Sequence, residues 1–185
     1  MQIRTTGIAD GTQLLSAIVA PARVVHVEAL RGTWHSPDLG FADILRLARR
    51  VTGTEFASVT LVEADRVVVL ACDGWGSHPM EKALTDALCA HTVALGCAMA
   101  VNDARSDPTL RDLSAVTALG AVAYLGVPIF DYSMIALGTL CVLDRRTRAW
   151  NAEHVDALSD LAGWAIERVI ARHTKLSPRN QTDLS

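Results

Sequence analysis

Thiol and imidazole groups are the side chains of this sequence with the widest chemical range. The 185-residue chain has four cysteines, Cys72, Cys89, Cys97 and Cys141, and six histidines. No two cysteines form a C-x-x-C pair, and no two histidines lie three to five residues apart. Zinc sites are typically built from such spacings, so we expect no metal site. In a reducing compartment the thiols should be free and should pack as small hydrophobic groups.

Two of the three cysteines in predicted strands, Cys97 and Cys141, share a strand face with apolar neighbours. Cys141 shares a strand face with Thr139 and Leu143, because side chains alternate along a strand. Cys97 shares a face with Met99 in the preceding predicted strand. Free cysteine is among the most often buried residue types, so we interpret both thiols as core packing.

Polar side chains gather after the strand that contains Met99, at Asn102, Asp103, Arg105 and Asp107. They can border a pocket and hydrogen-bond a polar ligand. Alternatively, the aspartates form turns in which their side chains accept hydrogen bonds from nearby backbone N–H groups. The turn interpretation is favoured for Asp107, which precedes a proline, and both interpretations stay open for Asp103 and Arg105.

Trp75 lies between two glycines, in a segment that we predict to be a loop. An aromatic side chain on such a loop can cover a pocket or pack at the rim of the core. The sequence has no nucleophile elbow, phosphate-binding loop, H-E-x-x-H motif or paired-carboxylate arrangement. We therefore predict that the chain is not an enzyme.

The composition restricts the possible partners. The net charge is −3 and 50% of the residues are hydrophobic, which is enough for a sizeable core. The densest basic run, 144–148, follows a predicted strand and is interpreted as a solvated turn, so no nucleic-acid partner is expected. No apolar run is long enough to cross a bilayer, and the N-terminus lacks the features of a secretion signal. We expect a cytoplasmic protein without a membrane partner.

The elements that position these side chains follow from hydrophobic periodicity. Apolar residues at helical spacing predict helices, and alternating or continuous apolar runs bounded by turn residues predict strands. The N-terminal region carries two short helical segments, 12–20 and 22–30. The remaining predicted elements are a helix over 41–53, a hairpin over 54–74, a helix over 80–96, a strand over 97–103, a short helix within 104–120, a hairpin over 121–144 and a helix over 151–172.

The order of these elements predicts an α+β fold with an antiparallel sheet of five to six strands flanked by helices, of the GAF or PAS kind. Neighbouring strands are mostly joined by tight turns, which is typical of antiparallel pairing. The last hairpin is apolar on both faces, so it belongs in the centre of a sheet that is covered on each side. We divide the chain into an N-terminal helical arm (1–28), one domain (29–172) and a disordered tail (173–185).

Five segments, in this order and at fitting intervals, resemble the GAF domain family from about Ala29 to Ile170. They are FADILRLARRVTGTEFASVTLV, CAMAVNDARSDPTLRD, YLGVPI, GTLCVLD and WNAEHVDALSDLAGWAI. The resemblance implies a palm-like sheet, one face of which closes over a small-molecule pocket.

The G-x-P of the third segment supports two interpretations. Gly126 leaves the sheet surface open to an approaching ligand, and Pro128 weakens strand pairing or lies at an edge. Alternatively, the two residues are the bend that a strongly twisted sheet needs. We expect the pocket to be apolar and without reactive groups. Its candidate residues are Trp75, Cys89, His91, Asp103, Arg105, Tyr124, Gly126, Thr139 and Cys141.

This sequence lacks motifs of several known GAF subfamilies, which argues against the activities of those subfamilies. Bilin-binding members attach the pigment to a cysteine directly followed by histidine, whereas this chain has Cys89-Ala90-His91. Free methionine sulfoxide reductases of the family use cysteines in the loop that corresponds to 108–126, which contains none here. The cyclic-nucleotide signature is also absent. One axial histidine, His91 or His154, is in principle enough for haem. The sequence requires no cofactor and identifies none.

The resemblance also implies a partner, because GAF domains often pair through their first and last helices. We expect a homodimer formed by the N-terminal arm and helix 151–172, unless the arm packs on its own domain. The expected function is a sensory or regulatory module that binds a small molecule or a partner protein and signals in trans. The alternatives are a ligand-free scaffold for dimerisation or docking and, third, a thiol redox enzyme of the free methionine sulfoxide reductase type.

Overall fold

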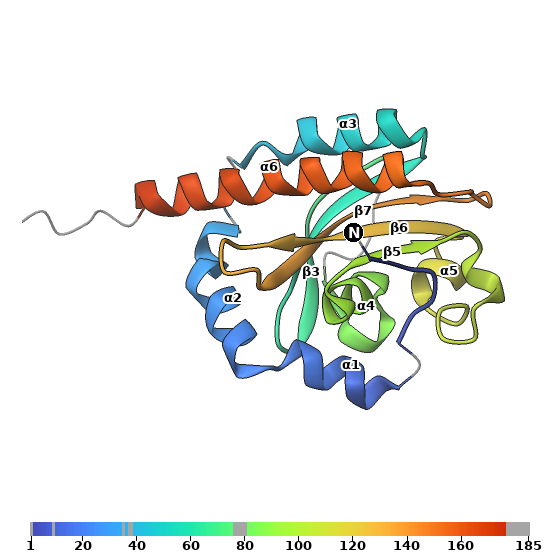
Figure 1. Ribbon diagram of the computed structural model, residues 1–185, viewed down its shortest axis with the longest axis horizontal. Coiled ribbons are helices and arrows are strands. Elements are labelled where there is room, and N and C mark those ends of the chain that lie inside the picture. The colour runs from blue at the N-terminus through green and yellow to red at the C-terminus, as the bar shows by residue number, and fades with distance from the viewer. Residues whose placement is uncertain (1, 9, 35, 37–38, 76–80, 177–185) are drawn as a thin grey trace, which may run out of the picture.

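A curved, mostly antiparallel sheet organises the chain in the computed structural model (Figure 1), which describes residues 1–185 except 1, 9, 35, 37–38, 76–80 and 177–185. Within the described residues the sheet has seven strands in the order β1-β5-β6-β7-β2-β3-β4. Only β1 and β5 pair in parallel among the described strands. The strands are β1 (Ile3–Arg4), β2 (Phe56–Val62), β3 (Arg66–Asp73), β4 (Glu81–Ala83), β5 (Ala98–Val101), β6 (Ala123–Phe130) and β7 (Ala136–Asp144).

The predicted α+β class and antiparallel sheet are confirmed, and the strand count is slightly higher than the predicted five to six. The additional strands, β1 and β4, lie at the two edges of the sheet and have two and three residues. A segment this short shows no hydrophobic period, so the sequence pattern did not indicate either strand.

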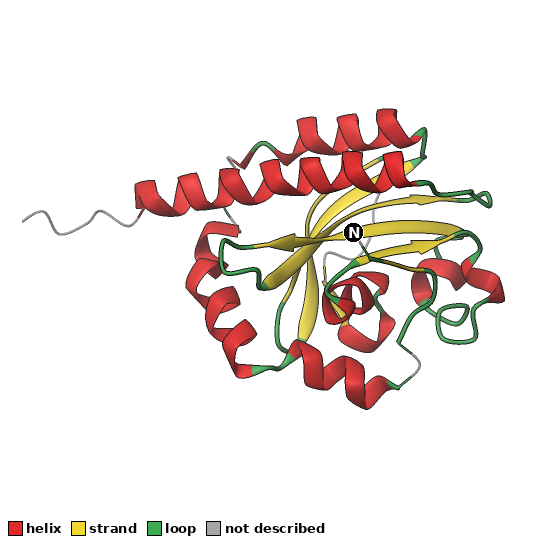
Figure 2. Cartoon of the chain, viewed as in Figure 1, coloured by secondary structure: helices red, strands yellow, loops and turns green. Residues whose placement is uncertain are grey.

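Helices cover both faces of the sheet (Figure 2). On the outer face, α3 (Phe41–Thr52) and α6 (Ala152–Leu176) lie side by side, and on the inner face lies α4 (Leu88–Leu95). Around the rim are α1 (Gly11–Ile18), α2 (Pro21–Trp34) and the short α5 (Ser114–Thr117), with 3-10 turns at Leu84–Asp86 and Ala104–Ser106. Helix α6 continues four residues beyond its predicted end at 172.

The sequence pattern explains α3 well. Its apolar residues Phe41, Ile44, Leu45 and Ala48 are buried against the outer face. Gly53 ends the helix in the left-handed conformation, with φ at 63°, and its N–H donates to the carbonyl of Arg49. Such a C-terminal glycine satisfies a carbonyl that the helix leaves unpaired.

The predicted helix over 80–96 is wrong in its first half. Glu81–Ala83 is a strand that pairs with the open edge of β3, with Lys82 opposite Val67. A 3-10 turn follows, and α4 begins only at Leu88. Pairing with an exposed sheet edge overrides the weak helical period of this segment. Met80, which the prediction placed in the helix, lies outside the described residues.

Side chains alternate between the two faces of the central strands. Ala57, Val59 and Leu61 of β2 belong to the outer core with α3 and α6, whereas Phe56 faces inward. β6 alternates in the same way, with Leu125 outside and Tyr124 inside. Pro128 follows Gly126, which is the last residue of β6 that pairs with β5. Because Pro128 has no partner on β5, its missing N–H does not interrupt the hydrogen bonds between β5 and β6.

The N-terminal arm packs on its own domain. Leu14 and Ile18 of α1 are buried with Val62, Val67 and residues of α4 in a separate apolar cluster. The buried guanidinium of Arg23, on α2, donates to the carbonyls of Ile18, Val62, Ala136 and Leu137 and so joins the arm to β2 and β7. No single described helix is long and apolar enough for a membrane span, although α1 and α2, bent by 55°, together meet the length and composition criteria. The arm therefore packs as the alternative to a dimer required, and a homodimer could use only its remaining exposed side chains, such as Val25, together with α6. The homodimer stays a prediction.

Candidate functional site

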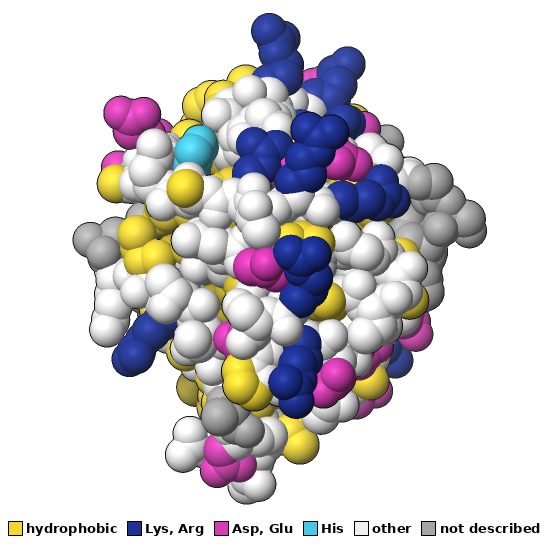
Figure 3. Space-filling view, turned by 90° about the vertical axis from the view of Figure 1, so that its right-hand side faces the viewer, with side chains coloured by type: hydrophobic (Ala, Val, Ile, Leu, Met, Phe, Trp, Pro, Cys, Tyr) yellow, Lys and Arg dark blue, Asp and Glu magenta, His cyan; other side chains and the backbone are white. Residues whose placement is uncertain are grey.

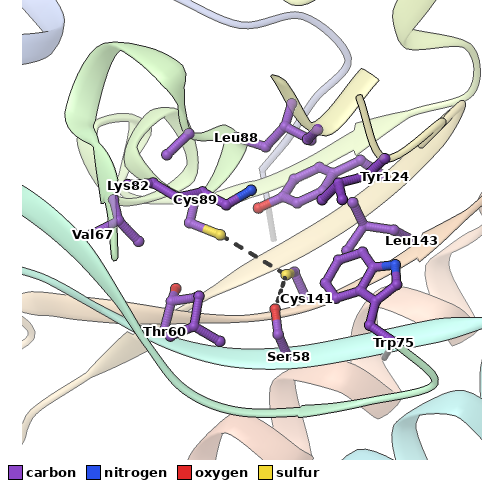
Figure 4. A pocket seen from close by; sticks show the side chains of 14 residues that line it. Ser58, Thr60, Val67, Trp75, Lys82, Leu88, Cys89, Tyr124, Cys141 and Leu143 are labelled. Carbon is purple, nitrogen blue, oxygen red and sulfur yellow. Dashed lines mark hydrogen bonds between the residues drawn. The ribbon is translucent and has the colours of Figure 1, made fainter. Parts of the chain in front are cut away.

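A small cavity lies between the inner face of the sheet and α4 (Figure 4). Its volume is about 40 Å³. On this measure a buried water needs roughly 10–15 Å³, so the cavity holds roughly three water-sized groups. Its lining is Ser58, Thr60, Val67, Val69, Trp75, Lys82, Ala87, Leu88, Cys89, Ala115, Leu119, Tyr124, Cys141 and Leu143.

The polar part of the cavity floor comes from two neighbouring strands. Ser58 pairs with Cys141 across β2 and β7, and Thr60 pairs with Thr139. Because these residues share the inward face, their side chains lie next to each other. The Ser58 Oγ–Cys141 Sγ distance is 3.1 Å. Ser58, Thr60 and Cys141 thus place two hydroxyls and a thiol on an otherwise apolar surface, and Thr139 lies beside them outside the lining.

Helix α4 supplies the opposite wall. Cys89 lies in its first turn and points toward the floor, and its Sγ is 3.9 Å from the Sγ of Cys141 (Figure 4). Thr139 Oγ1 donates to the Cys89 carbonyl oxygen at 3.2 Å. Thr92, one turn further along, hydrogen-bonds the Tyr124 hydroxyl at 2.7 Å. The expectation that the pocket lacks reactive groups is therefore wrong, because two thiols meet in it.

The two thiols differ in acidity. A hydrogen bond from Cys141 lowers the pKa of Cys89, with further contributions from the Thr60 hydroxyl and the positive charge of Lys82, which outweigh the effect of burial. The same interaction and burial raise the pKa of Cys141 well above its usual value. The thiolate of the pair is therefore favoured on Cys89, the sulfur nearer the N-terminus of α4.

Gly126 has a different role from the predicted one. A Cβ at this position would lie 2.0 Å from the Tyr124 hydroxyl oxygen and 2.5 Å from Cζ. The Tyr124 ring therefore lies across the glycine, and this chain's own side chain occupies the space that was expected to admit a ligand. Burial raises the pKa of Tyr124 well above its usual value, so its hydroxyl stays protonated at neutral pH.

Trp75 closes one side of the cavity. Its ring stacks on Phe56 with centroids 4.8 Å apart, and the Arg145 guanidinium lies 4.6 Å from the centroid of that phenylalanine ring. Lys82, on β4, lines the cavity beside Cys89 (Figure 4). The lining thus includes one aromatic side chain from the loop after β3 and one basic side chain from β4.

Four of the nine predicted site residues line the cavity together: Trp75, Cys89, Tyr124 and Cys141. Two more, Thr139 and Gly126, contact lining residues. The other three, His91, Asp103 and Arg105, lie elsewhere.

His91 points away from the cavity, because residues two apart on a helix face different directions. Its Nδ1 accepts the N–H of Ile8 at 3.0 Å. Asp103 and Arg105 form an ion pair at 2.6 Å on the surface, and that pair lowers the pKa of Asp103. A separate hollow includes Asp103 and Asp107, and Asp107 Oδ2 accepts the N–H of Gly7 at 3.3 Å.

The prediction missed Ser58, Thr60 and Lys82. A signal for the first two was present, since they are polar residues two apart in an otherwise apolar strand, on the face of Phe56. The sequence pattern placed Lys82 in a helix, so the position of its side chain in the cavity lining was not predicted. Within the described ranges, no three His, Cys, Asp or Glu side chains lie close enough to hold a metal ion.

Arginine side chains gather at the end of the molecule that carries the 145–150 loop (Figure 3). Several of these arginines form ion pairs with aspartate or glutamate side chains. Arg145 pairs with Glu55, Arg148 with Asp144, and Arg49, on α3, with Asp73. These pairs neutralise much of the local positive charge.

The first prediction tests the Tyr124–Gly126 arrangement. Replacing Gly126 with alanine should displace the buried tyrosine and lower the free energy of unfolding by about 1–3 kcal/mol, as overpacking usually does. Gly163→Ala is the matched control, because a Cβ on that α6 glycine meets nothing within 4 Å. It should instead stabilise the protein by roughly 0.5–1 kcal/mol. Urea unfolding measures both, and equal effects would contradict the assignment.

The second prediction concerns acid stability. Burial lowers the pKa of His91, although Asp107 partly opposes the shift. The unfolded chain therefore takes up this proton at a higher pH than the folded chain. The His91 contribution is present above the unfolded pKa of about 6.5 and is lost as the pH falls below it. Between about pH 6.5 and 5, the free energy of unfolding of His91→Gln should fall less than that of the wild type, as measured by denaturant titrations. An equal fall with pH in the two proteins would refute this role of His91.

Comparisons with known proteins address the fold and the family of the chain. No sequence among curated proteins matches the chain. Many solved structures share the fold. Free methionine-R-sulfoxide reductase from Neisseria meningitidis, in complex with its substrate, is 17% identical, with 95% of this chain and 99% of that chain covered and a TM-score of 0.60.

Two further structures come from a phosphotransferase and a chemotaxis protein. The GAF domain of a phosphoenolpyruvate-protein phosphotransferase from Acinetobacter is 13% identical, with 84% of this chain and 98% of that chain covered and a TM-score of 0.63. Residues 122 to 287 of a methyl-accepting chemotaxis protein are 18% identical, with 81% and 99% covered and a TM-score of 0.61. At these identities the similarity shows the fold alone. The GAF domain family itself matches residues 36–168, most of the chain, and the chain belongs to that family.

Proposed function

We propose that this chain is a sensory or regulatory GAF module that binds a small molecule in the cavity beneath α4. The observation that carries the proposal is the cavity itself, an apolar hollow with a few convergent polar groups. A lining of this kind is typical of small-molecule sites, although most such sites are larger, about 300–1,000 Å³. Structures of similar fold from a chemotaxis protein and a phosphotransferase support a sensory or regulatory role.

The size and charge of the cavity suggest the class of ligand. A volume of about 40 Å³ suits a molecule of a few non-hydrogen atoms, unless Trp75 swings away. Lys82 brings a positive charge to the lining, and Ser58 and Thr60 bring hydroxyl donors. A small carboxylate matches the charge and the hydroxyls, because the ammonium group neutralises it and the hydroxyls hydrogen-bond its oxygens. Acetate is nearest to the size of the cavity, whereas an acid of three or four carbons requires Trp75 to move.

A ligand-free scaffold is the second candidate, because the protein's own Tyr124 ring occupies much of the inner face. Its partner surface would be the expected homodimer contact of the arm and α6. Exposed apolar side chains lie on both, with Val25 66% and Trp164 50% exposed. A thiol enzyme of the reductase type is third, since segment 108–126 has no cysteine.

The third prediction tests the ligand class through the two lysines of the chain. Acetate, lactate and pyruvate, each compared with its neutral amide, are screened by thermal unfolding. A binding carboxylate should raise Tm by roughly 5–10 °C at about 100 times Kd, because it binds only the folded state. Lys82→Gln should abolish the rise, whereas Lys175→Gln, on the exposed end of α6, should keep it. An unchanged rise in Lys82→Gln, or none in the wild type, would refute the assignment.

The fourth prediction tests the dimer. Light scattering after size-exclusion chromatography should give twice the chain mass of 19.8 kDa for the wild type at micromolar concentration. Trp164→Glu should give a monomer, because a charge is poorly tolerated in an apolar interface. Tyr132→Glu changes a 76% exposed residue of the β6–β7 turn and should remain dimeric. A monomeric wild type would refute the expected homodimer.

A further inference from the structure

We propose that Cys89 and Cys141 are a peroxide-sensitive dithiol pair that closes to a disulfide between α4 and β7. This inference does not depend on the small-molecule proposal, since the two sulfurs are adjacent whether or not a ligand binds. It means that the cavity responds to an oxidant as well as to a small-molecule ligand.

The geometry brings together two thiols that are 52 residues apart in the sequence. Their Sγ atoms are 3.9 Å apart. A disulfide has an S–S length of about 2.05 Å, so the sulfurs must approach by roughly 2 Å. Cys89 is in the first turn of α4, and Cys141 is fixed in the centre of β7, paired with Ser58 on β2. Most of the movement therefore falls to Cys89.

The surroundings assign different roles to the two thiols. Cys89 has the features of a nucleophilic thiol, namely a helix N-terminus, the positive charge of Lys82 and hydrogen bonds from Thr60 and Cys141. Cys141 is fully buried and is protonated while Cys89 is a thiolate, because the interaction with Cys89 is the largest cause of its raised pKa. Oxidation of Cys89 removes that cause, so Cys141 becomes the more nucleophilic thiol only after its neighbour has reacted.

The reaction balances with peroxide as the oxidant. The Cys89 thiolate attacks one peroxide oxygen, the O–O bond breaks, and hydroxide leaves and takes up a proton to give water. The Cys89 sulfenic acid then reacts with the Cys141 thiol: the S–S bond forms, the S–O bond breaks, and the hydroxyl leaves with the thiol proton as a second water. The two thiols lose two electrons and two protons in total, and one hydrogen peroxide is reduced to two waters.

The cavity favours a peroxide over bulkier oxidants. It holds roughly three water-sized groups, which is enough for hydrogen peroxide beside Cys89. Glutathione disulfide is far larger than this space, and its attack would require α4 or Trp75 to move. Small oxidants should therefore reach the pair, whereas disulfide reagents should not.

The other two cysteines serve as internal references. Cys72 and Cys97 are partly exposed, and burial raises the pKa of each, with Asp73 adding to the effect at Cys72. A thiol with a raised pKa has less thiolate at neutral pH and reacts more slowly. Cys89 is partly exposed as well, so exposure does not predict which of the three thiols reacts first, and the order of reaction reports their chemical environment.

The test uses the intact reduced protein. One equivalent of hydrogen peroxide is added at pH 7, remaining thiols are capped with N-ethylmaleimide, and the protein is digested without reduction and analysed by mass spectrometry. We expect a linked peptide pair that contains Cys89 and Cys141, with Cys72 and Cys97 capped. Dithiothreitol should reverse the link. Oxidation first at Cys72 or Cys97, or an unreacted Cys89–Cys141 pair, would overturn the proposal.

Variants separate the roles. Cys89→Ser should slow peroxide consumption about tenfold, and Cys141→Ser should stop at a Cys89 sulfenic acid that dimedone traps. The double variant Cys72→Ser/Cys97→Ser should behave as the wild type, and because it leaves the cavity intact it keeps the test valid if a cavity variant misfolds. Equal oxidation by glutathione disulfide would overturn the assignment to peroxide.

Discussion

The packing of α4 on the inner face of the sheet determines how the Cys89 thiol meets the hydroxyls and the thiol that β2 and β7 supply. Two buried hydrogen bonds maintain it, one from Thr139 to the Cys89 carbonyl and one between Thr92 and Tyr124. Unpaired polar groups at these buried positions would be destabilising, so the helix has few alternative registers on the sheet. Gly126 contributes by leaving room for the Tyr124 ring.

The two faces of the sheet therefore differ in character. The outer face packs on α3 and α6 through aliphatic side chains alone at its centre, such as Val59, Leu125 and Leu140. Packing of this kind stabilises the fold but offers no chemistry. The inner face carries hydroxyls and thiols at the same depth, held by cross-strand neighbours such as Ser58 and Cys141. Helix α4 contacts this face through Thr92 and the Cys89 carbonyl, so the proposed sensory function requires that a change of charge or occupancy there acts on α4.

Much of the fold followed from local pattern, because α3, the two central hairpins and α6 have strong hydrophobic periods and clear turn residues. The five GAF-like segments lie in these elements, which explains why the family could be predicted. The edge strands were missed because pairing with a neighbour, rather than their own sequence, makes them strands. Lys82 was misplaced for that reason.

The site was predicted only in part. Trp75, Cys89, Tyr124 and Cys141 were among the candidates, but their convergence depends on strand register and on the exact start of α4. The proximity of Cys89 to Cys141 was not visible, because nothing in a single sequence aligns a helix residue with a strand residue 52 positions away. Cys141 was accordingly interpreted as core packing.

Hydrogen–deuterium exchange after chemical occupation of the cavity tests most directly whether α4 reports events there. In the Cys72→Ser/Cys97→Ser variant, iodoacetamide adds a small neutral group to Cys89, and exchange is compared before and after. We predict faster exchange over Leu88–Leu95 and unchanged exchange over Phe41–Thr52 of α3. Unchanged exchange in α4 on a fully modified protein would contradict the account.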